Sequence, residues 1–149
     1  MAKKLHYFNF IALAEPIRYI LHYTKQEFED VRHDHRFWPN PEFKEKVVTF
    51  IKETDPEKKK KLKRVIMDET IDFFFSRLDK DLKENGGYFS GKLSWVEFVL
   101  CGLVEASNYF LDTELEKKYP RVEAIIKHIK SLPGVKEYVE ARGPNVFKQ

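Results

Sequence analysis

Two histidines and an aspartate stand together in the 149-residue sequence, as His33, Asp34 and His35. Imidazole and carboxylate groups are common metal ligands, and alternate residues on a strand point to the same side. Two ligands of undefined geometry are not a metal site, because zinc in proteins takes three or four protein ligands. The sequence therefore predicts no metal.

The only cysteine, Cys101, is the other side chain with evident reactivity. It lies in the apolar stretch 98–104, which favours a buried core thiol over a nucleophile. A single cysteine excludes an internal disulfide and is typical of a reducing compartment, so a cytoplasmic location is expected. We find no Ser–His–Asp arrangement, no P-loop and no glycine-rich dinucleotide fingerprint.

Charge and hydropathy narrow the classes of partner. The net charge is only +3, from 27 basic and 24 acidic residues that are interspersed. The lysine run at 58–61 favours a solvated helix start over a nucleic-acid site, since no aromatic residues are interleaved there to stack on bases. Residues 1–9 are too polar for a signal peptide, and no apolar run reaches the ~18 residues of a membrane helix. We expect no nucleic-acid partner and no membrane span.

The elements that would carry these residues begin with an α/β unit. Residues 4–9 alternate weakly and predict a short strand, and residues 27–32 predict a second one. Between them, residues 14–23 predict a helix with Pro16 in its first turn. The prolines in 37–41 then break the chain. The order strand, helix, strand is half of a βαβ-type layer.

The rest of the sequence predicts only helices, the first of them at residues 43–52. Asp55 is expected to cap a helix that begins at Pro56 and ends in the Asn-Gly-Gly sequence of 85–87. Ser94 and Glu97 form a capping box before an apolar helix, which is expected at the centre of a bundle. Amphipathic helices at 120–130 and 133–142 close the chain. The stripe expected on the long helix consists of Leu62, Val65, Ile66, Phe73, Phe74, Leu78 and Leu82.

Taken together, these segments resemble sigma-class glutathione S-transferases, in particular those of arthropods. Residues 5–9 (LHYFN) and 12–19 (ALAEPIRY) are similar to the first strand and helix of that family. Residues 28–32 (FEDVR) and 38–40 (WPN) are similar to its second strand and the loop after it. In the C-terminal half, the similar segments are 91–95 (GKLSW), 119–120 (YP), 132–135 (LPGV) and 141–142 (AR).

The resemblance also implies an internal deletion. After the Trp-Pro pair, members of the family continue with a cis-proline loop, two antiparallel strands and a helix whose Gln-Ser pair holds the γ-glutamyl end of glutathione. Here Asn40 is followed directly by 41–44 (PEFK), which resembles the later part of the first helix of the family's C-terminal domain. The expected fold is thus an incomplete thioredoxin-like glutathione-binding domain, 1–40, followed by an all-helical C-terminal domain, 41–149.

By the same resemblance, four residues form the site. Tyr7 aligns with the catalytic tyrosine, whose hydroxyl would donate to the glutathione sulfur and favour the nucleophilic thiolate. Leu13 stands where some members have an arginine near the cofactor, and Trp38 aligns with a residue that contacts the glycyl end of glutathione. Phe8 would line the pocket for a hydrophobic co-substrate. The plainer alternatives are that Tyr7 packs a strand on a helix and that Trp38 covers the core edge.

The implied function is a detoxifying transferase that adds glutathione thiolate to hydrophobic electrophiles, or a related prostaglandin-type isomerase or peroxidase. Loss of two or three hydrogen bonds to charged groups of glutathione would remove about 4–6 kcal/mol of binding free energy. The alternative is a catalytically inactive derivative that carries hydrophobic ligands, serves a structural role or modulates a partner. A homodimer and a heterodimer with a full-length family member both stay open.

Overall fold

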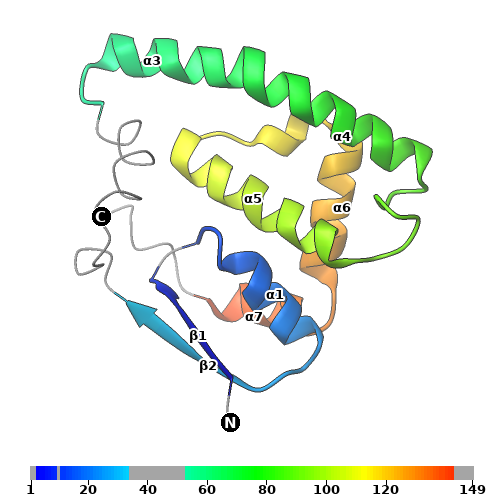
Figure 1. The fold of residues 1–149 in the computed structure, drawn as a ribbon. Helices are drawn as coiled ribbons and strands as arrows, with labels where there is room; N and C mark the ends of the chain where they lie inside the picture. The colour runs from blue at the N-terminus through cyan, green and yellow to red at the C-terminus, as the bar shows by residue number, and fades with distance from the viewer. Residues whose placement is uncertain (1–2, 10, 34–52, 143–149) are drawn as a thin grey trace.

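A strand–helix–strand unit opens the computed structural model, which describes residues 3–9, 11–33 and 53–142 (Figure 1). Strand β1 (Lys3–Phe8), helix α1 (Glu15–Tyr23) and strand β2 (Phe28–His33) follow one another. The two strands pair in parallel, which requires a crossover, and α1 provides it. This α/β start confirms the sequence prediction, and Pro16 stands in the first turn of α1 as expected.

A helical body follows, so the predicted fold class is confirmed as a whole. Its first rod is continuous through α3 (Pro56–Val65), the π-helical segment η2 (Ile66–Ile71) and α4 (Asp72–Glu84). Helix α5 (Trp95–Leu111) lies between this rod and α1 (Figure 1). The predicted breaker at 37–41 and the predicted helix at 43–52 lie outside the described residues.

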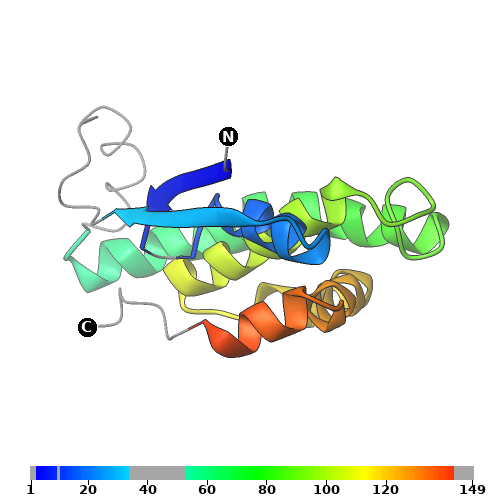
Figure 2. The ribbon, with the colours of Figure 1, turned by 90° about the horizontal axis from the view of Figure 1, so that it is seen from below.

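The chain closes with a 3-10 turn, η3 (Leu115–Lys118), and the helices α6 (Pro120–Ser131) and α7 (Val135–Ala141). Helix α6 packs against both α4 and α5, and α7 packs against α1. Figure 2 shows the sheet along one side of the molecule and α6 and α7 along the other, with α5 between. Helix α7 begins two residues later than predicted, because Gly134, at φ +84°, precedes its first turn.

Local caps define the helix ends as the sequence predicts. The Asp55 carboxylate accepts hydrogen bonds from the Glu57 and Lys58 amides, at 3.0 and 3.3 Å. The fully buried Glu97 carboxylate accepts from the Ser94 amide at 2.8 Å, which completes the capping box. Burial raises the pKa of Glu97, but hydrogen bonds from Ser94 and the Phe89 amide outweigh it and hold that pKa below its usual value.

The core lies where α4, α5 and α6 meet. Cys101 is fully buried there, as predicted, and burial raises the pKa of its thiol to about 12. A thiol in this state is an inert packing group. The other side chains of this buried cluster that are at most 1% exposed are Tyr19, Leu82, Val104, Val122, Ile129 and Val135.

The apolar stripe predicted on the long helix is wrong at two positions. Phe73 and Phe74 are 53% and 56% exposed, whereas Phe75 is buried. Phe73, Phe74, Leu78 and Leu82 all lie in α4, after η2. The residues that pack on the core are Ile71 at the end of η2 and Phe75, Leu78 and Leu82 of α4. Their spacings of three and four residues place them on one helix face, which leaves Phe73 and Phe74 on other sides. The predictions for Leu62, Val65 and Ile66 lie outside the described side chains.

Helix α5 is also less enclosed than predicted. Trp95, Val99 and Leu103 follow one another at a spacing of four residues and are 66%, 39% and 45% exposed. They form one side of the helix, which we call the α5 apolar row. No element of the described ranges covers this side. The helix is central only through its other faces, one of which meets Pro16 of α1 at Gly102.

Surface features agree with the solvated interpretation of the lysine run. Lys58, Lys59, Lys60 and Lys61 are exposed on the first turns of α3. Among the described helices, none combines the length and the hydropathy that crossing a bilayer requires.

Candidate functional site

The structure brings Tyr7 and Leu13 together. Tyr7 lies half-buried on β1, and Leu13 immediately precedes the turn into α1. Burial raises the pKa of the Tyr7 hydroxyl, while a hydrogen bond with the Leu13 backbone and the charge of Arg18 lower it, and the net direction is upward. The hydroxyl is therefore protonated near neutral pH, which is the state that donates a hydrogen bond.

The positive charge beside Tyr7 belongs to Arg18, a fully buried residue of α1. Its guanidinium carbon lies 6.0 Å from the centroid of the Tyr7 ring, at the outer range of a cation–π contact. Burial lowers the pKa of Arg18, but hydrogen bonds to Asp30 and Glu15 outweigh this and raise it, so the group stays charged. The site thus holds a neutral phenol next to a fixed cation.

Of the other predicted site residues, Phe8 lies on β1 directly after Tyr7. Leu13 is 60% exposed, and its backbone forms a hydrogen bond with the Tyr7 hydroxyl. Trp38 lies outside the described residues, and so do Asp34 and His35 of the His-Asp-His sequence. Within the described part of the chain, no three His, Cys, Asp or Glu side chains gather as a metal site would require.

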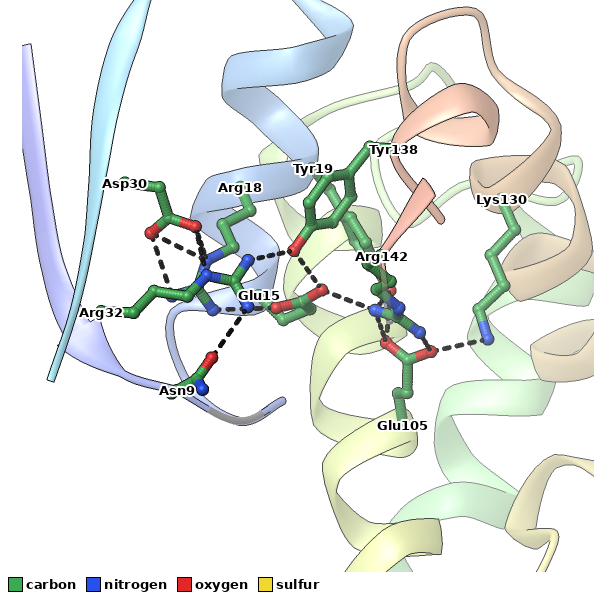
Figure 3. A network of polar contacts seen from close by, with 10 residues as sticks. All are labelled: Asn9, Glu15, Arg18, Tyr19, Asp30, Arg32, Glu105, Lys130, Tyr138 and Arg142. Carbon is green, nitrogen blue, oxygen red and sulfur yellow. Dashed lines mark hydrogen bonds and ion pairs between the residues drawn. The ribbon is translucent and has the colours of Figure 1, made fainter. Parts of the chain in front are cut away.

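A network of charged groups joins this site to the helical body (Figure 3). Glu15 of α1, 2% exposed in its side chain, accepts hydrogen bonds from Arg18 at 3.0 Å and from the Tyr138 hydroxyl at 2.8 Å. Arg142 pairs with both Glu15 and Glu105. Glu15 of α1 is therefore bound to the last helical segment twice, because it accepts hydrogen bonds from both Tyr138 and Arg142.

The far end of the network is centred on Glu105 of α5. Burial raises the pKa of Glu105, but the hydrogen bond from Arg142 and the charge of Lys130, 3.1 Å away, outweigh it and lower that pKa. The Tyr19 hydroxyl donates to the same carboxylate and accepts from Arg142 at 3.0 Å. Burial and the charge of Glu105 raise the pKa of Tyr19, so this phenol stays neutral.

Sequence analysis did not single out Arg18 or its partners. One local signal was present, because Glu15 and Arg18 stand three residues apart, a spacing that places both on the same side of a helix. The remaining partner, Asp30, comes from the neighbouring strand, with oxygens 3.1 and 3.2 Å from the Arg18 Nε. Helix α1 packs between the sheet and the helical body. A charged residue on such a helix indicates a buried ion pair.

Comparison with known proteins identifies relatives of the chain. The family model of the glutathione S-transferase C-terminal domain matches residues 41–142. Glutathione S-transferase S1 of Drosophila melanogaster is 25% identical over 193 aligned positions, which cover 93% of this chain and 78% of the relative. A glutathione S-transferase of Anopheles gambiae is 23% identical over 194 positions, which cover 93% and 96%. Both alignments are longer than the 149-residue chain. Each relative therefore has residues within the aligned region to which no residue of this chain corresponds.

Solved structures give the same picture of the fold. Prostaglandin synthase D of Nilaparvata lugens superposes with a TM-score of 0.81 at 25% identity, covering 97% of this chain and 100% of that one. Rat hPGDS complexed with a quinoline superposes with a TM-score of 0.72 at 17% identity, covering 95% and 98%. At 17% identity, the similarity to the rat protein concerns the fold alone.

Proposed function

The chain belongs to the glutathione S-transferase family, whose C-terminal domain spans most of its length, and we propose that it is a sigma-class member of arthropod type. In this proposal residues 1–40 are a shortened thioredoxin-like domain and residues 41–149 the helical domain. The co-substrate is glutathione, without a metal, and the reaction adds its thiolate to hydrophobic electrophiles. The names of the curated relatives, both glutathione S-transferases, support the co-substrate.

The observation that carries the proposal is the environment of Tyr7. A phenol that stays protonated at neutral pH, beside a buried cation, is suited to donate a hydrogen bond to a thiolate. Thiolate is the nucleophilic form of glutathione, so a donor that stabilises it raises the reactive fraction. Tyr7 is therefore proposed as the residue that activates the thiol.

The remaining roles follow from the family resemblance. Leu13 and Trp38 are proposed to contact glutathione, and Phe8 to line the pocket of the hydrophobic co-substrate. The name of the Nilaparvata lugens neighbour supports a prostaglandin-type substrate as one option. Because the γ-glutamyl-binding segment is missing, we expect binding weaker by about 4–6 kcal/mol than with the segment, or roughly a thousand- to ten-thousand-fold in Kd.

The proposed setting is the cytoplasm, where detoxification by glutathione takes place. A homodimer is proposed by family resemblance, and a heterodimer with a full-length family member is the further option. Both are open to sedimentation measurements on the protein alone and in mixture with a complete subunit.

Calorimetric titration with glutathione, run in parallel on the wild type and Tyr7→Phe, tests the proposal. Kd below about a millimolar, together with an ultraviolet thiolate signal that disappears in Tyr7→Phe, would support it. Absence of heat in both proteins would refute glutathione binding. Binding with an unchanged thiolate signal in Tyr7→Phe would refute the role of Tyr7 alone.

A second candidate function is a catalytically inactive derivative that binds hydrophobic ligands or protein partners. The observation in its favour is the α5 apolar row, together with the exposed Leu13, which precedes α1, and the exposed Ile17 of α1. Exposed apolar surfaces that are contiguous mark interaction sites. The discriminating result is binding of an apolar fluorescent probe that Trp95→Ser abolishes, in a protein that gives no heat with glutathione.

A further inference from the structure

The buried cation beside Tyr7 has a defined geometry. Arg18 reaches Asp30 through Nε, 3.1 Å from one carboxylate oxygen and 3.2 Å from the other, and through Nη2 at 3.2 Å. Its Nη1 reaches Glu15 at 3.0 Å. The guanidinium is thus fixed on both sides, with one partner on its own helix and the other on β2 (Figure 3). These hydrogen bonds hold the guanidinium carbon 6.0 Å from the centroid of the Tyr7 ring.

Burial raises the pKa of a phenol, because a medium of low dielectric disfavours the charged phenolate, and a phenol of higher pKa gives up its proton less readily. Burial is also the largest influence on the pKa of Tyr7. A fixed positive charge nearby acts in the opposite direction, and it acts more strongly inside a protein than in water. The resemblance places a charged residue near the cofactor in some relatives at the position of Leu13, which brings no charge here.

We propose that Arg18 is a positioning residue for Tyr7, which holds the ring against α1 and makes its hydroxyl a stronger donor towards a thiolate. The inference rests on the proposed function only in naming the glutathione thiolate as the group that accepts the hydrogen bond from Tyr7. The effect on Tyr7 itself exists without any ligand. Arg18 acts through Tyr7 and is not itself a catalytic residue.

The charge of Arg18 acts on the pKa of Tyr7, and the other charged side chains around Arg18 lie on α1 and β2. Helix α1 provides Arg18 and Glu15, and strand β2 provides Asp30 and Arg32, the latter directly opposite Tyr7 in the parallel register. Asp30 is shared by the two arginines, since the Arg32 Nε lies 2.8 Å from it. Removing the Asp30 charge therefore makes the surroundings of Tyr7 more positive. Removing the Arg18 charge makes them more negative, although Glu15 and Asp30 keep Arg142 and Arg32 as partners.

These opposite changes give a test that a purely structural role cannot satisfy. The probe is the ring carbon resonance of Tyr7 in protein with labelled tyrosine, followed through alkaline titration without glutathione and assigned with Tyr7→Phe. Arg18→Gln is expected to lower the acid ionisation constant of Tyr7 about threefold or more, which is a rise in its pKa. Asp30→Asn is expected to raise that constant by a smaller factor, because it leaves the Arg18 charge less compensated. Arg18→Lys keeps the charge and is expected to recover most of the wild-type value.

Shifts in the same direction for Arg18→Gln and Asp30→Asn, or no shift in either, would overturn the proposal, because loss of packing would then explain the result. If Arg18→Gln does not fold, the direction found for Asp30→Asn decides by itself. Should glutathione fail to bind while the opposite shifts are observed, the proposed function is refuted and the role of Arg18 stands. If glutathione binds, Arg18→Gln is expected to lower the bound thiolate fraction at neutral pH with little change in Kd.

Discussion

Replacing Arg142 with methionine is expected to destabilise the fold substantially. The guanidinium pairs with Glu15 and Glu105, and the three side chains are only 15%, 2% and 11% exposed. Removing one partner of a buried ion pair costs about 3–5 kcal/mol, because an uncompensated charge stays inside. Lys130 still neutralises Glu105 at 3.1 Å, so we expect the lower end, about 3 kcal/mol.

Urea denaturation followed by far-ultraviolet circular dichroism measures this loss. With a slope of about 1–3 kcal/mol/M, the midpoint is expected to fall by about 1–3 M. Arg121→Met is the matched control, since Arg121 is exposed on α6 and its loss should change stability by no more than about 0.5 kcal/mol. A loss for Arg142→Met below about 1 kcal/mol, or equal to that of the control, would refute the argument that the network stabilises the junction.

The same substitution is expected to change the response to acid. The pKa of Glu105 is lowered below its ordinary value of 4.5 in the folded protein, chiefly by Arg142 against the opposing effect of burial. Such a carboxyl contributes stability above its unfolded pKa, and that contribution is lost as pH falls through the folded pKa. The urea midpoint should therefore fall more steeply below pH 4.5 in the wild type than in Arg142→Met. Equal slopes would show that Arg142 does not set this pKa.

Three further predictions concern packing. Gly102→Ala places a Cβ 2.5 Å from the Pro16 ring, so overpacking should outweigh the gain in helix propensity by about 1–2 kcal/mol and lower Tm; an unchanged Tm would contradict the close approach of α1 and α5. Phe75→Ala should cost about 3–5 kcal/mol in urea unfolding, and Phe74→Ala less than about 1 kcal/mol, with equal losses counting against the burial of Phe75 and the exposure of Phe74. Cys101, fully buried with a thiol pKa of about 12, should react with a thiol reagent at least about a hundredfold more slowly in the native protein than in urea, and a fast native reaction would exclude this burial.

Much of the fold was predictable because its signals are local. The capping box spans only Ser94 to Glu97, and the N-cap at Asp55 acts on amides two and three residues ahead. Amphipathic spacing likewise identified both strands, α1 and α6, each from a window of about ten residues. The placement of Tyr7 on the first strand follows from the same alternation.

Local patterns are ambiguous where several apolar residues are consecutive, as Phe73, Phe74 and Phe75 are. Only Phe75 falls on the face that Ile71, Leu78 and Leu82 share at spacings of three and four residues, and it alone of the three is buried. The exposure of Trp95 on α5 has a different origin. An apolar helix indicates burial on every side, and only the arrangement of its neighbours decides which side they leave open.

The sequence by itself determined the order and type of the described strands and α-helices, the buried state of Cys101 and the family to which the chain belongs, but not the segments η2 and η3. It did not determine the charged network, because the partners stand far apart in the chain. Arg18 and Asp30 are separated by 12 residues, Arg142 and Glu105 by 37, and Arg142 and Glu15 by 127. Only the tertiary structure decides such pairs, since an ion pair forms where folding removes two charges from water together, and no local periodicity encodes that encounter.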